Sequence, residues 1–224
     1  MYIQSKKLIS TILCASILAL GLATTANAAL ESRLGGLAVY DTDLDITWLA
    51  DANAGAGSSF DDADDPNDGK MTWDNAVAWA ADLDIYGVSG WRLPAADPVC
   101  GRGANCFNSE MGHLFYNELG GTYRESILFS SDPDLALFTN IPSINGWTWT
   151  GTEFAPNSID AWIFDISYGG QGVDGKHHPG LSTAWAVHSG DVGLLSPVPE
   201  PHQYAMMVLG LAGLLGYARL RRRI

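Results

Sequence analysis

The stretch Trp-Thr-Trp-Thr-Gly-Thr at residues 147–152 decides the fold class of this chain. Its large apolar and small polar residues alternate with a period of two, which is typical of a half-buried β-strand. Two more β-prone runs follow at residues 161–166 and 184–187, and glycine-rich turns separate the runs. We therefore predict an antiparallel meander in the C-terminal third of the chain.

Trp147 and Trp149 lie on one face of this strand because their positions differ by two. Two adjacent indoles can form either a platform on which a sugar stacks or a part of the core between elements. Tryptophan is highly buried on average, so we favour the core. Trp147 and Trp149 remain the candidate sugar-binding residues.

The run from residue 39 to residue 48 also alternates, and we expect one half-buried strand there. Its exposed face would carry Asp41, Asp43 and Asp45. These three charges repel each other, and a hard cation would relieve the repulsion. The spacing does not match an EF-hand, because Ile46 replaces the required glycine and Ala52 the required glutamate. We favour a solvated acidic face over a metal site.

Two short helices are predicted between these segments. Thr72 caps the first, whose buried stripe consists of Trp73, Ala76, Val77, Ala80 and Leu83. Ser109 caps the second, whose apolar face consists of Met111, Leu114, Phe115 and Leu119, and Gly120 ends it. The predicted fold class is α+β, with two short helices packed on antiparallel strands.

The histidines give no recognisable metal motif. His113 follows Glu110 by three residues, but a di-iron site needs that pair twice, so we interpret His113 as a surface or partly buried residue. His177 and His178 lie in a predicted loop, where we expect them to be solvated.

The segment from residue 53 to residue 70 is rich in Gly, Ser and Asp and is predicted to be a loop. It contains the crowded carboxylates Asp61, Asp62, Asp64, Asp65 and Asp68. Holding five carboxylates together requires either screening by solvent or a Ca²⁺ ion, which takes six to eight oxygen ligands. A calcium site and a mobile acidic loop are both compatible with this pattern.

Cys100 and Cys106 remain after export, and an oxidising compartment favours their pairing. The closed ring of seven residues would stabilise the fold by about 2 kcal/mol in the loop-entropy model. A redox function is not favoured, because the spacing differs from Cys-x-x-Cys.

The N-terminus resembles an export signal. Lys6 and Lys7 precede an apolar run at residues 8–23, and the small residues Ala26 and Ala28 mark a cleavage site for signal peptidase before Ala29. The alternative is a membrane anchor that is not cleaved. We expect a signal peptide at 1–28 and a globular domain at 29–198.

The C-terminal tail, residues 199–224, combines Pro199, Glu200 and Pro201 with an apolar helix at 204–218 and the cluster Arg221, Arg222 and Arg223. The uncharged run 205–218 would be about 21 Å long as a helix, against about 30 Å of hydrocarbon. Flanking arginines make up part of the difference and stay on the cytoplasmic side. This pattern predicts a membrane helix, with an ordinary anchor as the alternative to a sorting signal.

Charge excludes one class of partner. The segment 29–198 contains 24 of the 25 acidic residues and only six of the 12 lysines and arginines, so its net charge is near −18. Binding to nucleic acids and sulfated polymers depends on cationic side chains that replace condensed counterions. We therefore expect no nucleic-acid partner.

The order of elements in the tail resembles the PEP-CTERM sorting signal of Gram-negative bacteria. The resemblance implies that an exosortase-type protease recognises Pro199, Glu200 and Pro201 and removes the tail. The protein would be anchored transiently in the inner membrane and would then reach the cell surface or the extracellular matrix, within surface polysaccharide.

The segments of the globular part, taken in order, resemble the Lcl-type domain, named for the C-terminal domain of a Legionella collagen-like adhesin. The segments that carry the resemblance are 36–41, 48–53, 71–73, 90–94, 147–153, 161–164 and 184–191. The resemblance implies a compact fold similar to C-type lectins. That adhesin's affinity for sulfated glycans does not transfer to so acidic a domain.

No hydrolase elbow, zinc-protease motif or phosphate loop is present in the sequence. The export topology and the resemblance to the Lcl-type domain favour a non-enzymatic binding module for glycan or matrix components. The alternatives are an extracellular glycan hydrolase and a purely structural matrix protein. No cofactor is required, although Ca²⁺ would fit the acidic loop.

Overall fold

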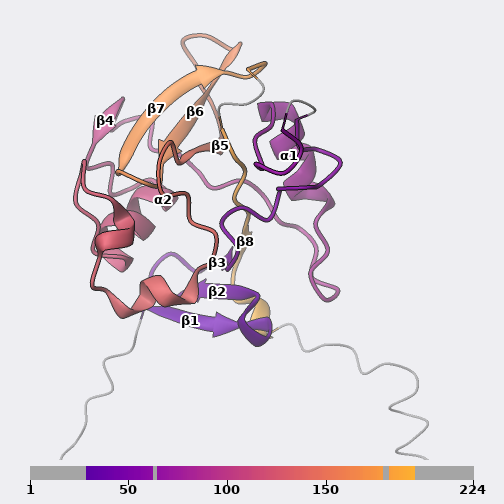
Figure 1. Cartoon of the computed structure of the whole chain (residues 1–224), viewed down its shortest axis with the longest axis vertical. Coiled ribbons are helices and arrows are strands. Elements are labelled where there is room, and N and C mark those ends of the chain that lie inside the picture. Colours follow the sequence, from indigo (N-terminus) through magenta and orange to yellow (C-terminus); the bar gives the residue numbers. More distant parts are fainter. Residues whose placement is uncertain (1–28, 63–64, 179–181, 195–224) are drawn as a thin grey trace, which may run out of the picture.

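The computed structural model describes residues 29–62, 65–178 and 182–194 (Figure 1). Two four-stranded antiparallel sheets form the framework. The first has the order β1 (Leu30–Arg33), β2 (Ala38–Asp41), β3 (Ile46–Leu49) and β8 (Val187–Ser189). The second has the order β4 (Gly103–Ala104), β7 (Gly170–Gly175), β6 (Asp160–Asp165) and β5 (Trp147–Glu153). Together with α1 (Trp73–Asp82) and α2 (Glu110–His113), these sheets confirm the mixed α+β class.

The strand predicted over residues 39–48 is wrong in one respect, because it is a hairpin of β2 and β3. The carboxylate of Asp41 turns the chain by accepting hydrogen bonds from the backbone N–H groups of Asp43 and Leu44. The solvated three-carboxylate face is therefore also wrong. Asp43 and Asp45 are exposed, whereas Asp41 is fully buried.

The C-terminal meander is confirmed in its first two strands, which are β5 and β6. The third strand is β7, in a segment that sequence patterning assigned to turns, and it pairs with β6 along its whole length. The run 184–187 instead connects the two sheets. Trp149 N–H donates to the carbonyl of Thr183, and Leu49 N–H donates to that of Ala186. Val187 then begins β8, which pairs with β3.

The first predicted helix is confirmed together with its cap, because Thr72 Oγ1 accepts a hydrogen bond from Asn75 N–H. The predicted stripe is partly wrong. Val77 is exposed, and Trp79, which the stripe omitted, is buried with Ala76 and Ala80. The buried face of this ten-residue helix therefore consists of residues 76, 79 and 80.

The second predicted helix is confirmed in its cap and its buried face, which consists of Met111, Leu114, Phe115 and Leu119. Gly120 follows it with φ +62°. The regular α-helix ends earlier than expected, however, at His113. A π-helical turn, η2 (Leu114–Glu118), continues the segment.

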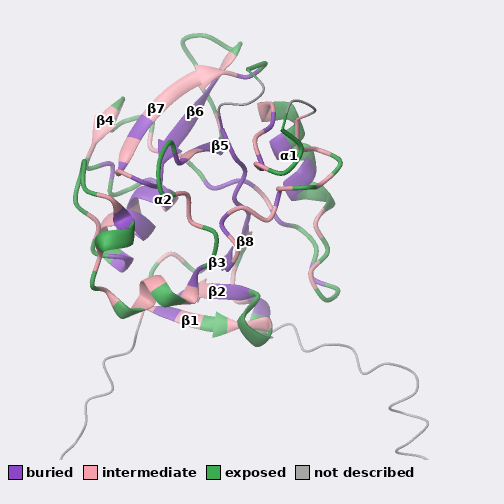
Figure 2. Ribbon diagram, viewed as in Figure 1, coloured by how far each residue is buried: buried purple, intermediate pink, exposed green. Residues whose placement is uncertain are grey.

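The core extends through both sheets and the helices, and Figure 2 shows buried residues in β2, β3, α1, α2 and β6. Trp185 lies at its centre, fully buried. Its ring contacts Trp48 and Phe138 edge to face, with centroids 5.4 Å apart in both pairs. Its indole N–H donates to the carbonyl of Leu49. This packing fixes the position of the hairpin that carries Asp41.

The predictions for both ends concern residues outside the described ranges. These include the cleavage site at Ala26 and Ala28, the Pro199-Glu200-Pro201 triplet, the apolar helix 204–218 and the cluster Arg221, Arg222 and Arg223. Among the helices that the structure describes, none has the length and apolar character needed to cross a membrane.

Candidate functional site

Asp41, His113 and Glu118 form a cluster of ionisable side chains inside the domain. Asp41 ends β2, His113 ends α2, and Glu118 ends the π-turn. Asp41 is 0 % exposed and Glu118 7 %. Within the described part of the chain, this is the one group of three His, Cys, Asp or Glu residues whose possible ligand atoms all lie within 4.8 Å of one another.

The three side chains converge on one point, but they do not form well-aligned hydrogen bonds with one another. His113 Nε2 lies 2.9 Å from Glu118 Oε1 and 4.0 Å from Asp41 Oδ2. Asp41 Oδ2 is buried and has no well-aligned hydrogen bond, whereas the buried His113 Nε2 has the carboxylate of Glu118 as its polar neighbour. Buried polar atoms are nearly always satisfied, so the unpartnered Oδ2 of Asp41 indicates a missing partner in the cluster.

The π-turn explains how His113 and Glu118 come to face the same point. In a regular α-helix, two residues five positions apart are about 140° apart around the axis. In the π-turn the hydrogen bond joins positions five apart, here Leu119 N–H to the carbonyl of Leu114. This wider turn brings positions 113 and 118 to one side. Such turns occur frequently at functional sites.

Burial controls the electrostatics of the two carboxyls. It raises the pKa of Asp41, and this effect is opposed by the turn N–H groups and by His113. Burial also raises the pKa of Glu118, and the neighbouring Asp41 charge raises it further. Both ionised forms are therefore disfavoured unless a positive charge lies beside them.

Asn117 completes the surroundings of the cluster. Its side-chain amide lies 3.0 Å from His113 Nδ1, the ring nitrogen that faces away from the two carboxylates. An amide can present either its N–H or its oxygen to that nitrogen after a half-turn of the side chain. Asn117 can therefore select which ring nitrogen of His113 carries the proton.

Sequence reasoning did not find this cluster. Asp41 was assigned to a solvated face. His113 was interpreted as a surface or partly buried residue, and the second alternative is confirmed, because its side chain is 12 % exposed. Glu118 was not considered. A π-turn has no sequence signal comparable to a cap, so the approach of residues 113 and 118 was not predictable.

The acidic loop is confirmed as a loop, but the carboxylates of Asp61, Asp62 and Asp68 are used by groups of the loop itself. Asp61 accepts hydrogen bonds from the N–H groups of Gly57 and Gly69. Asp62 accepts one from Asp65 N–H, and Asp68 pairs with Lys70 at 2.7 Å. Asp64 lies outside the described residues. A calcium site in this loop stays a prediction.

The disulfide between Cys100 and Cys106 is present. It closes the loop that precedes α2, and Cys106 is buried. The backbone N–H of Ser109 then donates to the carbonyl of Cys106, and the Ser109 hydroxyl donates to the same oxygen. The disulfide loop therefore leads directly into the N-terminus of α2.

The two tryptophans of β5 do not form an exposed platform. Trp149 is fully buried, and its indole N–H donates to the carbonyl of Met71 at 2.8 Å. Trp147 is half-buried, and its ring packs over Gly172 of β7. The pair belongs to the core, in line with the favoured alternative, because the face of β5 that holds both rings is turned inward.

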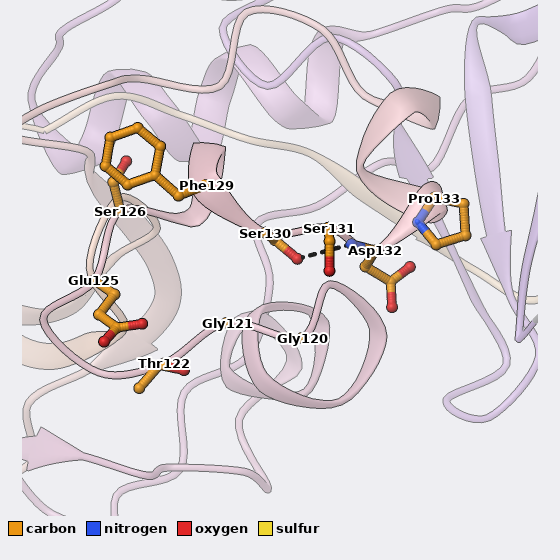
Figure 3. A pocket seen from close by; sticks show the side chains of 10 residues that line it. All are labelled: Gly120, Gly121, Thr122, Glu125, Ser126, Phe129, Ser130, Ser131, Asp132 and Pro133. Atoms are coloured by element: carbon orange, nitrogen blue, oxygen red, sulfur yellow. Dashed lines mark hydrogen bonds between the residues drawn. The ribbon is translucent and has the colours of Figure 1, made fainter.

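An exposed pocket of about 370 Å³ lies after the π-turn. Figure 3 shows Phe129 and Glu125 on one side of it, Ser131 and Asp132 on the other, and the backbone of residues 120–121 between them. Phe129 is 87 % exposed. The pocket therefore combines one accessible aromatic ring with hydroxyl groups and two carboxylates.

Comparison with known proteins bears on the tail. Residues 197–223 match the model of the PEP-CTERM protein-sorting motif. The chain carries this sorting motif. The motif implies an exported protein, transiently anchored in the membrane, whose processing partner is an exosortase-type protease.

No curated protein and no solved structure matches the chain. The match covers only the C-terminal tail and lies after the described globular part, so the resemblance to the Lcl-type domain and to C-type lectins has no support from these comparisons. The mature domain has to be interpreted from its own geometry.

Proposed function

We propose that the exported domain is a non-enzymatic module that binds neutral glycans at the cell surface or in the extracellular matrix. The observation that supports this proposal is the exposed ring of Phe129 beside the polar pocket. An exposed aromatic ring offers a flat apolar surface that one C–H face of a pyranose can cover. Binding pockets generally combine such a surface with a few polar groups that fix orientation.

The polar groups of the pocket suit a neutral ligand. Glu125 and Asp132 can accept hydrogen bonds from sugar hydroxyls, and the hydroxyls of Thr122 and Ser131 can donate or accept. The pocket is lined by no lysine or arginine, so it offers no cation to a sulfated or uronic glycan. The net charge near −18 of residues 29–198 disfavours anionic ligands further.

The sorting motif supports the location. A protein released into surface polysaccharide by an exosortase-type system encounters glycans at high local concentration. A weak binding site of the size of this pocket is then sufficient to retain the protein in the polysaccharide.

Calorimetric titration with neutral oligosaccharides tests the proposal. The ligands are oligosaccharides of six glucose, galactose or mannose units. We expect Phe129→Ala to weaken binding roughly tenfold, equivalent to about 1.4 kcal/mol. The thermal midpoint should not change, because the ring makes few contacts. Tyr86→Ala is the matched control, since it removes another exposed aromatic ring, 76 % accessible, away from the pocket.

Two results would contradict the proposal. Equal affinities of the wild type and Phe129→Ala would remove the pocket as the site. New reducing ends in the same mixtures would show bond cleavage and would favour the alternative of a glycan hydrolase.

A further inference from the structure

We infer that Asp41, His113 and Glu118 bind one divalent transition-metal ion and that Zn²⁺ is the preferred ion. This site goes beyond the proposed glycan-binding function and does not depend on it. The three residues come from the first sheet, from α2 and from the π-turn, so the ion would join segments about 70 residues apart in the chain.

Geometry is the first argument. Zn²⁺ binds imidazole nitrogen and carboxylate oxygen at about 2.0–2.2 Å, so two ligand atoms on one ion lie at most about 4.4 Å apart. The distances from His113 Nε2 to Glu118 Oε1 and to Asp41 Oδ2, 2.9 and 4.0 Å, fall within this limit. All the ligand atoms lie within 4.8 Å of each other. Small side-chain rotations would therefore complete the site.

The unsatisfied oxygen of Asp41 is the second argument. Asp41 Oδ2 is buried and has no well-aligned hydrogen-bond partner. The other oxygen of Asp41 is used by the turn N–H groups of Asp43 and Leu44, which hold the carboxylate in place. Oδ2 therefore faces His113 at 4.0 Å, and the Trp48 side chain is the donor that acts on the Asp41 carboxyl.

Charge is the third argument. Two buried carboxylates need compensation, and a protonated His113 would supply only one positive charge. Among the described residues, no lysine or arginine forms an ion pair with the cluster. Arg33, Lys70, Arg92 and Lys176 pair with other carboxylates. A divalent ion would neutralise both carboxylates at once.

The donor set selects the ion. Ca²⁺ and Mg²⁺ prefer sites made wholly of oxygen, and Ca²⁺ takes six to eight ligands. One imidazole with two carboxylates suits Zn²⁺ and, more weakly, Mn²⁺. We assign Asn117 a positioning function, because its amide oxygen can accept the proton of His113 Nδ1 and direct the lone pair of Nε2 toward the ion.

The experiment uses purified full-length protein that has been stripped with EDTA and dialysed. We expect one Zn²⁺ per chain by calorimetry, weaker Mn²⁺ binding and none for Ca²⁺ at this site. At a free Zn²⁺ concentration of about 100 times Kd, the thermal midpoint should rise by roughly 5 °C or more. Co²⁺ should give visible absorption bands that report the His and carboxylate ligands.

Two variants test the ligands. Asp41→Asn keeps the oxygen that accepts the turn N–H groups, and Glu118→Gln keeps the shape of the side chain. Both should weaken Zn²⁺ at least about tenfold and abolish the midpoint shift. Asp43→Asn, an exposed neighbour, is the matched control and should bind like the wild type. If a variant does not fold, the Zn²⁺ titration of the other variant still decides the question.

The surface histidines provide the opposite control. His178 lies 3.0 Å from Asp174 on the exposed β7 turn and can bind Zn²⁺ weakly by itself. The inference is overturned if the His178→Ala variant loses the bound ion while Asp41→Asn and Glu118→Gln keep it. It is also overturned if Zn²⁺ leaves the thermal midpoint of the wild type unchanged.

Discussion

Asp191 is held by the guanidinium of Arg33 through two hydrogen bonds of 2.7 and 2.9 Å. These bonds join β1 to the segment after β8, 158 positions later. The side chains are only 10 % and 21 % exposed, so solvent screens the pair weakly. Arg33 lowers the pKa of Asp191 below its ordinary value of 3.8.

The lowered pKa fixes the sign of the pH dependence. A carboxyl with a lower pKa in the folded state stabilises the fold above its unfolded pKa, and this stabilisation is lost as the pH falls through the folded value. We expect Asp191→Asn to lower the free energy of unfolding by about 1 to 2 kcal/mol at pH 7. The difference from the wild type should shrink below pH 3.8.

Urea unfolding at pH 7 and at pH 3 measures the difference in unfolding free energy between Asp191→Asn and the wild type at each pH. Glu31→Gln is the control, because Glu31 contacts the same guanidinium but is 39 % exposed, and its loss should change stability by less than about 1 kcal/mol. A constant difference between Asp191→Asn and the wild type across this pH range would contradict the linkage.

Single residues also show the limit of sequence analysis. Alternation along residues 39–48 placed Asp41 on the same face as Asp43 and Asp45, because a strand pattern only indicates which residues share a face. The actual position of Asp41 depends on its carboxylate closing a turn and on the distant π-turn that packs against it. Contacts between segments about 70 positions apart leave no periodic signal in the sequence. The cluster could therefore be recognised only in the three-dimensional structure.

At the scale of elements, α2 packs unusually close to the disulfide loop. A Cβ added to Gly112 would lie 2.0 Å from the carbonyl oxygen of Cys106 and 2.6 Å from Ser109 Oγ. Backbone cannot move away as a flexible side chain can. We expect Gly112→Ala to destabilise the domain by about 2 to 3 kcal/mol, as measured by thermal or urea unfolding.

Gly170→Ala is the control for this prediction. Its nearest neighbour to an added Cβ is a ring atom of Tyr123 at 3.7 Å, an ordinary contact, so the change should stay below about 1 kcal/mol. Similar losses in both variants would show that the close approach of α2 to Cys106 does not matter for stability.

The success of the element predictions depended on local chemistry. Thr72, Ser109 and Gly120 were correctly identified as helix boundaries because each forms or permits its cap within a few residues. The third strand of the meander was missed because β7 contains three glycines and its pairing partner, β6, supplies the apolar residues. Its structure comes from tertiary context, which overrides β-propensity.

At the scale of the whole molecule, charge dominates the behaviour in solution. The segment 29–198 has 24 acidic and six basic residues, and self-repulsion destabilises a compact state. We expect the thermal midpoint to rise as NaCl increases from about 10 to about 150 mM, because the Debye length falls from roughly 30 to 8 Å. KCl should have the same effect, and a midpoint that falls with either salt would contradict this explanation.

The sequence also predicted the sorting motif of the tail, which the family comparison confirms at residues 197–223. Its order of charged, apolar and proline residues is readable without a fold. Ligand preference of the mature domain was not readable in this way. Phe129 lies in no alternating or helical pattern that would mark it as exposed. Trp149, one of the two candidate sugar-binding residues, is buried, as the favoured core interpretation predicted.

The Arg33–Asp191 pair has a mechanical consequence for a protein tethered by its C-terminal side. A load applied beyond Leu194 reaches Asp191 after three residues and passes through the guanidinium into β1, while β8 shares it with β3 through their backbone hydrogen bonds. Both ends of the domain are thereby fastened to one sheet (Figure 1). Tension on the tether is therefore carried by the strands at the two ends of the chain, and the second sheet with its meander is shielded from it.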